Sequence, residues 1–297
     1  MEIGLIDVDS HNFPNLALMK ISAWHKQNGD SVEWWNGLKY YDRVYQSKIF
    51  DSKYTEDNEF CVNAGEIIKG GTGYDLKNKL PYEIEHQYPD YELYGINNTA
   101  YGFLTRGCPR HCQFCIVSEK EGNTHTVASV EEFWQGQKNI VLMDSNITAS
   151  KECADHFKAL AQTKATVDFE GGLDIRFMDE RKALLLNKIK VKQIHFAWDR
   201  YEDKITPEKL KEYAQIATHK PHGRYAMVYV LTNFDTTIEQ DLERIYRLIE
   251  MNYDPFVMIY DKKNADHEYI KLQRWCNNKW VLAKCPRYED YKKKERF

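Results

Sequence analysis

The chain has 297 residues, enough for one large α/β unit or two modest domains, and its 42% hydrophobic and 13% aromatic content can supply a packed core. Its formal net charge of −4 excludes a global electrostatic field for nucleic acid or an anionic membrane. No apolar run approaches the roughly 20 residues that a membrane span needs, and no signal peptide precedes the first strand-like run, so we expect a cytoplasmic protein.

Residues 1–95 are predicted to form a small, flavodoxin-like α/β domain. Short apolar runs predict strands at 3–8, 31–35, 41–50 and 66–69. Apolar residues at helical spacing predict a helix over 16–27, which ends before the turn signal Asn28-Gly29. Residues 70–73 are Gly-Gly-Thr-Gly, where the backbone can approach a ligand closely or simply turn. Residues 78–95 lack periodicity and are expected to be a connector.

Residues 96–262 are predicted to alternate strands with helices. The strands are expected at 101–104, 140–143, 167–169, 194–198, 226–231 and 256–260. Capping boxes that begin at Ser129 and Thr237, and Thr206 followed by Pro207, mark helix starts. Six βα repeats imply a parallel sheet with right-handed crossovers, and a curved (βα)6 partial TIM-type barrel fits better than a flat sheet.

Polar residues follow each of these runs at its carboxyl end. Parallel βα folds bind their ligands at that rim, so we expect these groups to share one mouth with the loop after the first strand. The candidates are Asp144 and Asn146 after the second run, Asp174 and Arg176 after the third, Asp199 after the fourth, and Thr232 and Asn233 after the fifth. Residues 263–297 are predicted to add one helix, over 268–276, and irregular chain.

The loop after the first of these strands carries Cys108, Cys112 and Cys115 in a C-x3-C-x2-C pattern. Seven cysteines are an odd number, and three are clustered, which in a reducing compartment favours a metal site over disulfides. A [4Fe–4S] cluster normally takes four thiolates, so three would leave one iron open to another molecule.

The triplet could instead hold structural zinc, with His111, His125 or Cys153 as the fourth ligand. Zinc sites usually combine two separated pairs of ligands, and the sequence has no second pair. The four cysteines outside the triplet are expected to be buried or spare thiols.

With the aromatic Phe114 before its last cysteine, the triplet resembles that of the radical S-adenosylmethionine (radical SAM) superfamily. The segments 144–146, 172–176 and 196–200 also resemble segments of members that carry cobalamin-type amino-terminal domains. The resemblance implies that the three cysteinates hold three irons while SAM chelates the fourth. One electron would then split SAM into methionine and a 5′-deoxyadenosyl radical, which removes hydrogen from a substrate.

The resemblance also implies roles for the rim residues, although the family's usual Gly-Gly-Glu after the second strand is absent here. Phe114 would contact the adenine of SAM, Asp144 and Asn146 its amino group, and Arg176 its carboxylate. Asp174 or Asp199 would accept from the ribose hydroxyls, and Thr232 and Asn233 would be further cofactor contacts.

The amino-terminal domain resembles, in part, a cobalamin-binding domain. Asp9-Ser10-His11 begins a D-x-H-x-x-G pattern in which Pro14 replaces the glycine, and Gly70-Gly71 matches the loop that would face the nucleotide tail of the corrin. The domain is short for that family. We therefore expect it to support the barrel, with cobalamin binding as the alternative.

The predicted function is radical SAM chemistry on an unknown substrate, which could be a peptide, a nucleoside or a small metabolite. The family's habit implies a flavodoxin or ferredoxin as electron donor. One alternative is cobalamin-dependent methyl transfer, and another is a non-catalytic iron–sulfur or zinc module. Methylthiolation is disfavoured, because that family's amino-terminal unit carries three cysteines of its own and this one has only Cys61.

Overall fold

The structure is a computed structural model that describes residues 1–11, 13–56, 62–219 and 226–294, and the chain divides into two compact units. Unit 1 contains residues 1–102 and 128–137, and unit 2 contains residues 103–127 and 138–297. The segment 128–137 packs with unit 1 because the Tyr91 hydroxyl donates to the Phe133 carbonyl at 2.7 Å and the Phe133 ring lies directly against Gly102. Sequence reasoning instead divided the chain at residue 95.

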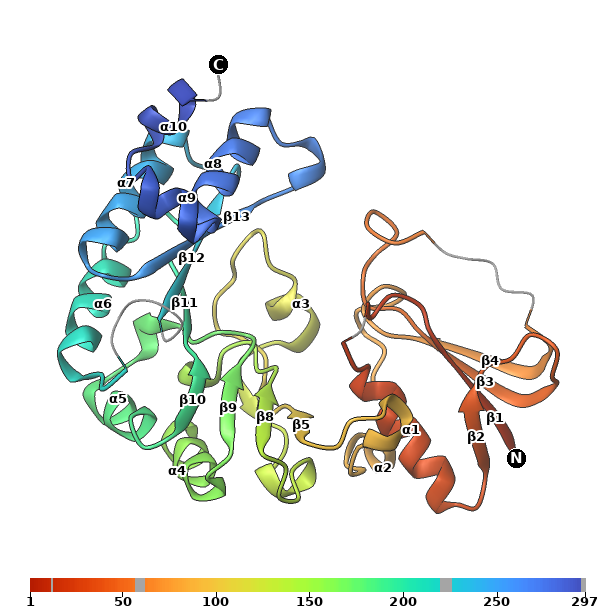
Figure 1. The fold of residues 1–297 in the computed structure, drawn as a ribbon. Helices are drawn as coiled ribbons and strands as arrows, with labels where there is room; N and C mark the ends of the chain where they lie inside the picture. Colours follow the sequence, from red (N-terminus) through yellow and green to blue (C-terminus); the bar gives the residue numbers. More distant parts are fainter. Residues whose placement is uncertain (12, 57–61, 220–225, 295–297) are drawn as a thin grey trace. The chain divides into compact units, whose positions relative to one another are not determined.

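Unit 1 contains a four-stranded parallel sheet in the order β2-β1-β3-β4 (Figure 1). Its strands are β1 (Glu2–Asp7), β2 (Ser31–Trp34), β3 (Tyr41–Ser47) and β4 (Ala64–Gly70). Helix α1 (Leu16–Gln27) begins at its cap Asn15, whose side chain accepts from the Leu18 N–H. Its apolar face buries Leu18 and Ile21 against Ile3 and Leu5, at roughly 1.5–3 kcal/mol for each fully buried side chain. The predicted strands and helix are confirmed.

The connector after this sheet has more regular structure than its sequence predicts. It contains α2 (Tyr82–Glu85) and the 3-10 helix η1 (Tyr91–Tyr94), and it leads into β5 (Thr99–Gly102). These two short helices are stabilised by burial, because each places one large side chain, Ile84 or Tyr91, in the core of unit 1. The Ser129 capping box is confirmed, but it opens only a single 3-10 turn, η2 (Val130–Glu132).

Unit 2 contains two sets of parallel strands. They are β8 (Asn139–Leu142), β9 (Thr166–Phe169) and β10 (Lys190–Gln193) in one set, and β11 (His195–Ala197), β12 (Met227–Thr232) and β13 (Asp254–Ile259) in the other. Only Ile194 separates β10, which pairs with β9, from β11, which pairs with β12. The sequence pattern misses β10 because Val191 is its one buried residue.

Helices follow these strands along the chain. They are α4 (Cys153–Thr163), α5 (Glu180–Leu186), α6 (Ile205–Ile216) and α7 (Ile238–Glu250). Figure 1 shows α4, α5 and α6 along one side of the strands, and the yellow loop with α3 (Val117–Glu121) along the other. None of the described helices combines the length and the apolar character that crossing a membrane would require.

Helix α7 carries a buried arginine that donates hydrogen bonds to the ends of two strands. Its Thr237 capping box is confirmed. The Arg244 guanidinium, fully buried, donates to the Trp198 carbonyl at 2.5 Å and the Leu231 carbonyl at 2.7 Å. It also pairs with the buried carboxylate of Asp241 at 2.5 Å, which balances its charge.

Helix α6 is capped by a different side chain from the one predicted. The sequence favours Thr206 as the cap, with Pro207 in the first position, but the helix already begins at Ile205. The Asp203 carboxylate accepts from the N–H groups of Ile205 at 2.9 Å and Thr206 at 3.1 Å. One Asp203 oxygen accepts both N–H groups, and its other oxygen accepts from the Thr206 hydroxyl at 2.7 Å, so Thr206 is bonded to the capping carboxylate. The prediction of Thr206 as the cap is wrong.

The carboxyl-terminal segment is more helical than predicted. Helix α8 (His267–Asn277) confirms the expected helix, but α9 (Lys279–Lys284) and α10 (Tyr288–Lys294) replace the expected irregular chain. The Asn278 side chain caps α9 by accepting from the Trp280 and Val281 N–H groups. The indole N–H of Trp275 donates to the Cys285 carbonyl at 2.7 Å, so the end of α9 is held against α8.

Candidate functional site

The three cysteines lie on a loop of unit 2 that is closed at its base by two short strands. β6 (Thr105–Arg106) pairs antiparallel with β7 (His125–Thr126), and α3 lies between them along the chain. Near the start of the loop, the Cys108 N–H donates to the Gly122 carbonyl at 2.9 Å. The two ends of the cysteine loop are therefore held together by backbone hydrogen bonds.

The Glu121 carboxylate strengthens this closure from inside the loop. It accepts from the Gly107 N–H at 3.0 Å and pairs with the Arg106 guanidinium at 2.9 Å. Gly107 has a φ of +84°, and a Cβ placed there would lie 2.4 Å from the Asn123 carbonyl oxygen. Only glycine combines this backbone conformation with so close an approach.

Asp144 holds the chain segment that leads into the cysteine loop. Its side chain is 2% exposed, and one oxygen accepts from the Thr105 N–H at 2.5 Å and the Thr105 hydroxyl at 2.6 Å. The other oxygen accepts from the Leu104 N–H at 3.1 Å. Burial nevertheless raises the pKa of Asp144 to about 6, since desolvation outweighs these hydrogen bonds. The carboxylate thus faces the protein backbone.

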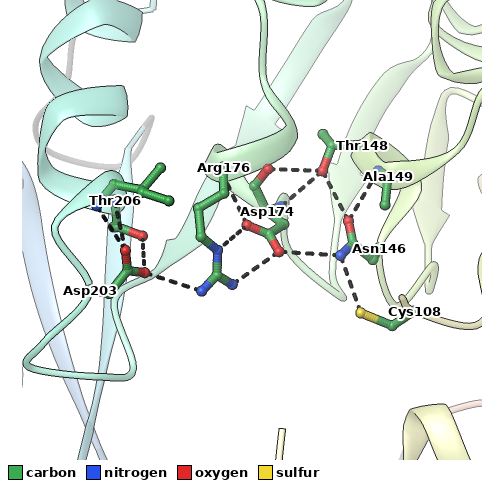
Figure 2. A network of polar contacts seen from close by, with 9 residues as sticks. Cys108, Asn146, Thr148, Ala149, Asp174, Arg176, Asp203 and Thr206 are labelled. Atoms are coloured by element: carbon green, nitrogen blue, oxygen red, sulfur yellow. Dashed lines mark hydrogen bonds and ion pairs between the residues drawn. The ribbon is translucent and has the colours of Figure 1, made fainter. Parts of the chain in front are cut away.

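Asn146 joins the cysteine loop to the loop that follows β9 (Figure 2). Its side-chain nitrogen lies 3.3 Å from the Cys108 sulfur and 3.3 Å from an oxygen of Asp174. Its side-chain oxygen accepts from the Ala149 N–H at 3.2 Å and so caps the 3-10 helix η3 (Ile147–Ala149). The Thr148 hydroxyl lies 3.0 Å from the same oxygen. One buried amide therefore connects a predicted cysteine ligand to two rim segments.

Asp174 and Arg176 form a bidentate ion pair next to this amide. The Nε and Nη2 of Arg176 lie 2.7 Å and 3.0 Å from the two oxygens of Asp174, and its Nη1 lies 3.2 Å from Asp203. Asp174 also caps the 3-10 helix η4 (Ile175–Phe177). Burial lowers the pKa of Arg176, but Asp174 and the neighbouring carboxylates outweigh it, so the pKa is raised.

Asp199 shares the electrostatic environment of the cysteine loop. Burial raises its pKa to about 6, although the positive charges of Arg176, Arg244 and Arg110 act in the opposite direction. The pKa of the Cys115 thiol is also raised, first by desolvation and then by the negative charges of the other two cysteines and of Asp199. These groups are close enough to influence one another's ionisation.

An aromatic contact links the cysteine loop to the end of β12. Phe114 meets Phe234 edge to face with ring centres 5.4 Å apart, and Phe234 meets Tyr260 in the same way at 4.9 Å. The two polar candidates beside them contact the end of β13 instead of the cysteine loop. The Asn233 side chain donates to the Tyr260 carbonyl at 2.8 Å, and the buried Thr232 hydroxyl lies 3.5 Å from the Met258 carbonyl.

The other cysteines lie outside this cluster. Cys153, Cys276 and Cys285 are buried free thiols, as the sequence predicts, and Cys61 lies outside the described residues. Burial raises the pKa of Cys153 to about 12, which keeps it a neutral thiol. Across the described ranges, no three His, Cys, Asp or Glu side chains gather closely enough to hold a single metal ion. In a [4Fe–4S] cluster each thiolate binds a different iron, so that kind of centre does not require such close packing.

Sequence reasoning did not single out two of the residues that build this site. Asp203 fixes Arg176, and Thr148 contacts Asn146. Phe234 was expected at the rim, but its contact with Phe114 was not. A signal was available for Asp203, because an aspartate three residues before Thr206 is a typical helix start. The contacts of Phe234 and Thr148 depend on side-chain directions that a single sequence does not specify.

No protein-family model and no curated protein matches this chain. Among solved structures, the radical SAM methyltransferase TsrM from Kitasatospora setae, with cobalamin and a [4Fe–4S] cluster bound, matches with a TM-score of 0.63 at 10% sequence identity. The match covers 86% of this chain and 74% of TsrM. The fold is similar to that of TsrM. A second TsrM structure, with tryptophan substrate and the SAM analogue aza-SAM bound, matches with a TM-score of 0.61 over 86% of this chain and 72% of TsrM, again at 10% identity.

The TsrM fold agrees with the family that the cysteine motif resembles. The sequence resemblance to radical SAM enzymes is therefore confirmed at the level of the fold, which is mixed α/β with parallel sheets. An identity of 10% carries no residue-level comparison, so the roles of individual residues depend on the geometry described above.

Proposed function

We propose that this chain is a radical SAM enzyme whose Cys108, Cys112 and Cys115 hold a [4Fe–4S] cluster. When bound, the cluster supplies one electron that splits SAM into methionine and a 5′-deoxyadenosyl radical, which abstracts hydrogen from the substrate. The observation that carries the proposal is the 3.3 Å contact between Asn146 and Cys108. It joins the cysteine loop to the carboxyl ends of parallel strands, where βα folds bind ligands.

The donor set suits an iron–sulfur cluster. Thiolates are the soft ligands that such clusters take, and the three cysteines are half-buried or exposed on one loop. Unit 2 contains two sets of parallel strands, and only Ile194 separates β10 of one set from β11 of the other. This arrangement supports a partial TIM-type barrel. The helices along one side of the strands support the same architecture.

The rim residues divide into those that could bind SAM and those that position others. Arg176 uses three of its five N–H groups on Asp174 and Asp203, so the remaining ones could meet the SAM carboxylate. Phe114, held by Phe234, could pack against the adenine. Asp199 could accept ribose hydroxyls. Asp144 is better assigned to positioning the cysteine loop than to the SAM amino group.

The substrate is proposed to be a peptide, a nucleoside or a small metabolite, and the electron donor a flavodoxin or ferredoxin. The edge-to-face rings of Phe114, Phe234 and Tyr260 form an apolar wall that suits a planar group. The buried free thiols Cys153 and Cys276 support a reducing, cytoplasmic setting.

The proposal is tested by anaerobic reconstitution of the full chain with iron and sulfide. We expect about four irons per chain, a change in the electron paramagnetic resonance (EPR) signal of the reduced cluster when SAM is added, and 5′-deoxyadenosine after reduction. Cys108→Ala should lose all three, and Cys276→Ala, which removes a buried thiol far along the chain, should retain them. One zinc, no iron and no nucleoside product would remove the enzyme proposal.

A second candidate is cobalamin-dependent methyl transfer, and the sheet of unit 1 favours it. The order β2-β1-β3-β4 corresponds to the flavodoxin-like order, in which ligands bind at the switch point between β1 and β3. TsrM, whose structure contains cobalamin, matches 86% of this chain. Titration of the full chain with hydroxocobalamin should then give a stoichiometric change in the corrin spectrum. No binding at saturating concentrations would remove this candidate and leave the first.

The folding of unit 1 alone can also explain the residues in the loops at this switch point. Both oxygens of Asp9 accept backbone hydrogen bonds, from the N–H groups of Ile49 at 2.7 Å and Phe50 at 2.9 Å. A Cβ at Gly71 would lie 2.3 Å from the Lys48 carbonyl oxygen, so its glycine is required by packing alone. These contacts support the interpretation that the residues at this switch point serve the folding of unit 1 itself.

A further inference from the structure

We propose that Asn146 raises the reduction potential of the cluster by donating an N–H···S hydrogen bond to Cys108. We further propose that a chain of half-buried polar side chains, Asp174, Arg176 and Asp203, holds its amide in the donating orientation. This inference rests on the proposed function, because it requires a cluster bound by Cys108. It adds a residue and a physical role that the cysteine motif does not specify.

The partners of Asn146 determine which way its amide points. Its side-chain oxygen faces the Ala149 N–H, which can only donate, at 3.2 Å. Its nitrogen faces the Cys108 sulfur and an Asp174 oxygen, both acceptors, at 3.3 Å each. A flipped amide would place an N–H against an N–H and an oxygen against a carboxylate. The network therefore assigns one N–H of Asn146 to the Cys108 sulfur.

The neighbouring ion pairs restrict any movement of this amide (Figure 2). Asn146 is 2% exposed, and the side chains of Asp174 and Arg176 are 9% and 12% exposed. Arg176 holds both oxygens of Asp174, and Asp203 holds Arg176 from the start of α6 at 3.2 Å. The Asp174 carboxylate, which orients Asn146, is thus held by Arg176 in the segment after β9 and, through Arg176, by Asp203 in the segment after β11.

A hydrogen bond to a cluster sulfur changes the reduction equilibrium in a definite direction. Reduction adds one negative charge to the cluster, and an N–H dipole aimed at a ligating sulfur stabilises the more negative state. Loss of the bond should therefore make reduction harder. We expect about a tenfold change in the reduction equilibrium, which corresponds to about 59 mV for one electron.

The test is a redox titration of the reconstituted full chain, followed by EPR spectroscopy. Asn146→Leu removes the donor while keeping a side chain of similar size, and its cluster should be about tenfold harder to reduce than wild type. Asn187→Leu is the matched control, because it also removes an asparagine amide that donates and accepts hydrogen bonds: the half-buried Asn187 ends α5, donates to the Ile216 carbonyl and accepts from the Thr218 N–H. Its cluster should titrate as wild type does.

A second measurement does not depend on any variant. Pulsed EPR of the reduced wild-type cluster, in protein labelled with ¹⁵N at the side-chain amide of asparagine, should show a weak nitrogen coupling. Titration curves that coincide for wild type and Asn146→Leu would overturn the inference while leaving the proposed function intact. If Asn146→Leu assembles no cluster, the nitrogen coupling decides, and its absence overturns the inference. A wild-type chain that takes up no iron would instead refute the proposed function, and the inference with it.

Discussion

Replacement of Gly107 by alanine should open the base of the cysteine loop. An alanine at a φ of +84° costs about 1–2 kcal/mol in backbone strain alone. Its Cβ would also lie 2.4 Å from the Asn123 oxygen and 2.7 Å from the Gly122 oxygen, both backbone atoms that side-chain rotation cannot move. The strands at the loop base must therefore separate to accommodate the methyl group.

Separation breaks two hydrogen bonds whose contributions can be added to the strain. The bond from the Cys108 N–H to Gly122 contributes about 0.5–1.5 kcal/mol, and the bond from the Gly107 N–H to the charged Glu121 contributes about 1.5–3 kcal/mol. With the strain, Gly107→Ala should destabilise the closed loop by about 3–6 kcal/mol. Since 1.4 kcal/mol is a factor of ten, amide exchange in residues 107–124 should become at least about a hundredfold faster.

Hydrogen exchange measured by mass spectrometry, together with the alkylation rate of the three loop cysteines, reports this opening directly. Gly29→Ala is the matched control, because Gly29 has a φ of +81° and nothing within 4 Å of its missing Cβ. It should cost only the strain, about 1–2 kcal/mol, and leave the cysteine loop unchanged. Equal losses for the two substitutions, with no faster exchange in residues 107–124, would refute the reasoning.

Three further predictions concern the supports of the site. Asp203→Ala should destabilise the protein by about 1–2 kcal/mol in chemical unfolding, more than Thr206→Ala does, because Asp203 caps α6; the reverse order would restore Thr206 as the cap. Asp241→Ala should cost about 3–5 kcal/mol, because it leaves the Arg244 charge buried and unbalanced, and a loss below about 1 kcal/mol would contradict this. Burial raises the pKa of Asp144 from 3.8 to about 6, so the folded protein binds its proton more tightly than the unfolded chain does. The free energy of unfolding should therefore fall by up to about 3 kcal/mol as the pH rises from about 4 to about 6. An unfolding series across this range should show a larger fall in wild type than in Asp144→Asn, which keeps the fall due to Asp199, whose pKa burial also raises to about 6. Equal falls in wild type and variant would count against the assignment.

Features of this fold that depend on local patterns could be predicted from the sequence. The capping boxes at Ser129 and Thr237 form as expected, because each needs only residues three positions apart. The same local reasoning failed at Thr206, because the helix begins one residue before it and the Asp203 carboxylate accepts from the N–H groups of Ile205 and Thr206. Strand β10 was missed because it buries a single side chain and shows no apolar run.

The candidate site could be predicted only in part. The cysteine pattern and the rim positions identify the elements that meet, because carboxyl ends of parallel strands share one edge. The partners themselves depend on distances across the fold. Asn146 reaches Cys108 over 38 residues of sequence, and Asp144 turns toward Thr105 instead of toward the rim. Charge and spacing identify such residues as candidates, and side-chain geometry decides which of them bind and which of them position others.

The hydrogen bonds at the base of the cysteine loop have a consequence for the protein when it is exposed to oxygen. Since the pairing of β6 with β7 and the contacts of Glu121 need no cofactor, the loop ends are brought together when the polypeptide folds, before the proposed cluster binds. Oxidative destruction of the proposed cluster should then leave a folded apoprotein whose cysteine loop is still closed. Such an apoprotein should take up fresh iron and sulfide again after its thiols are reduced.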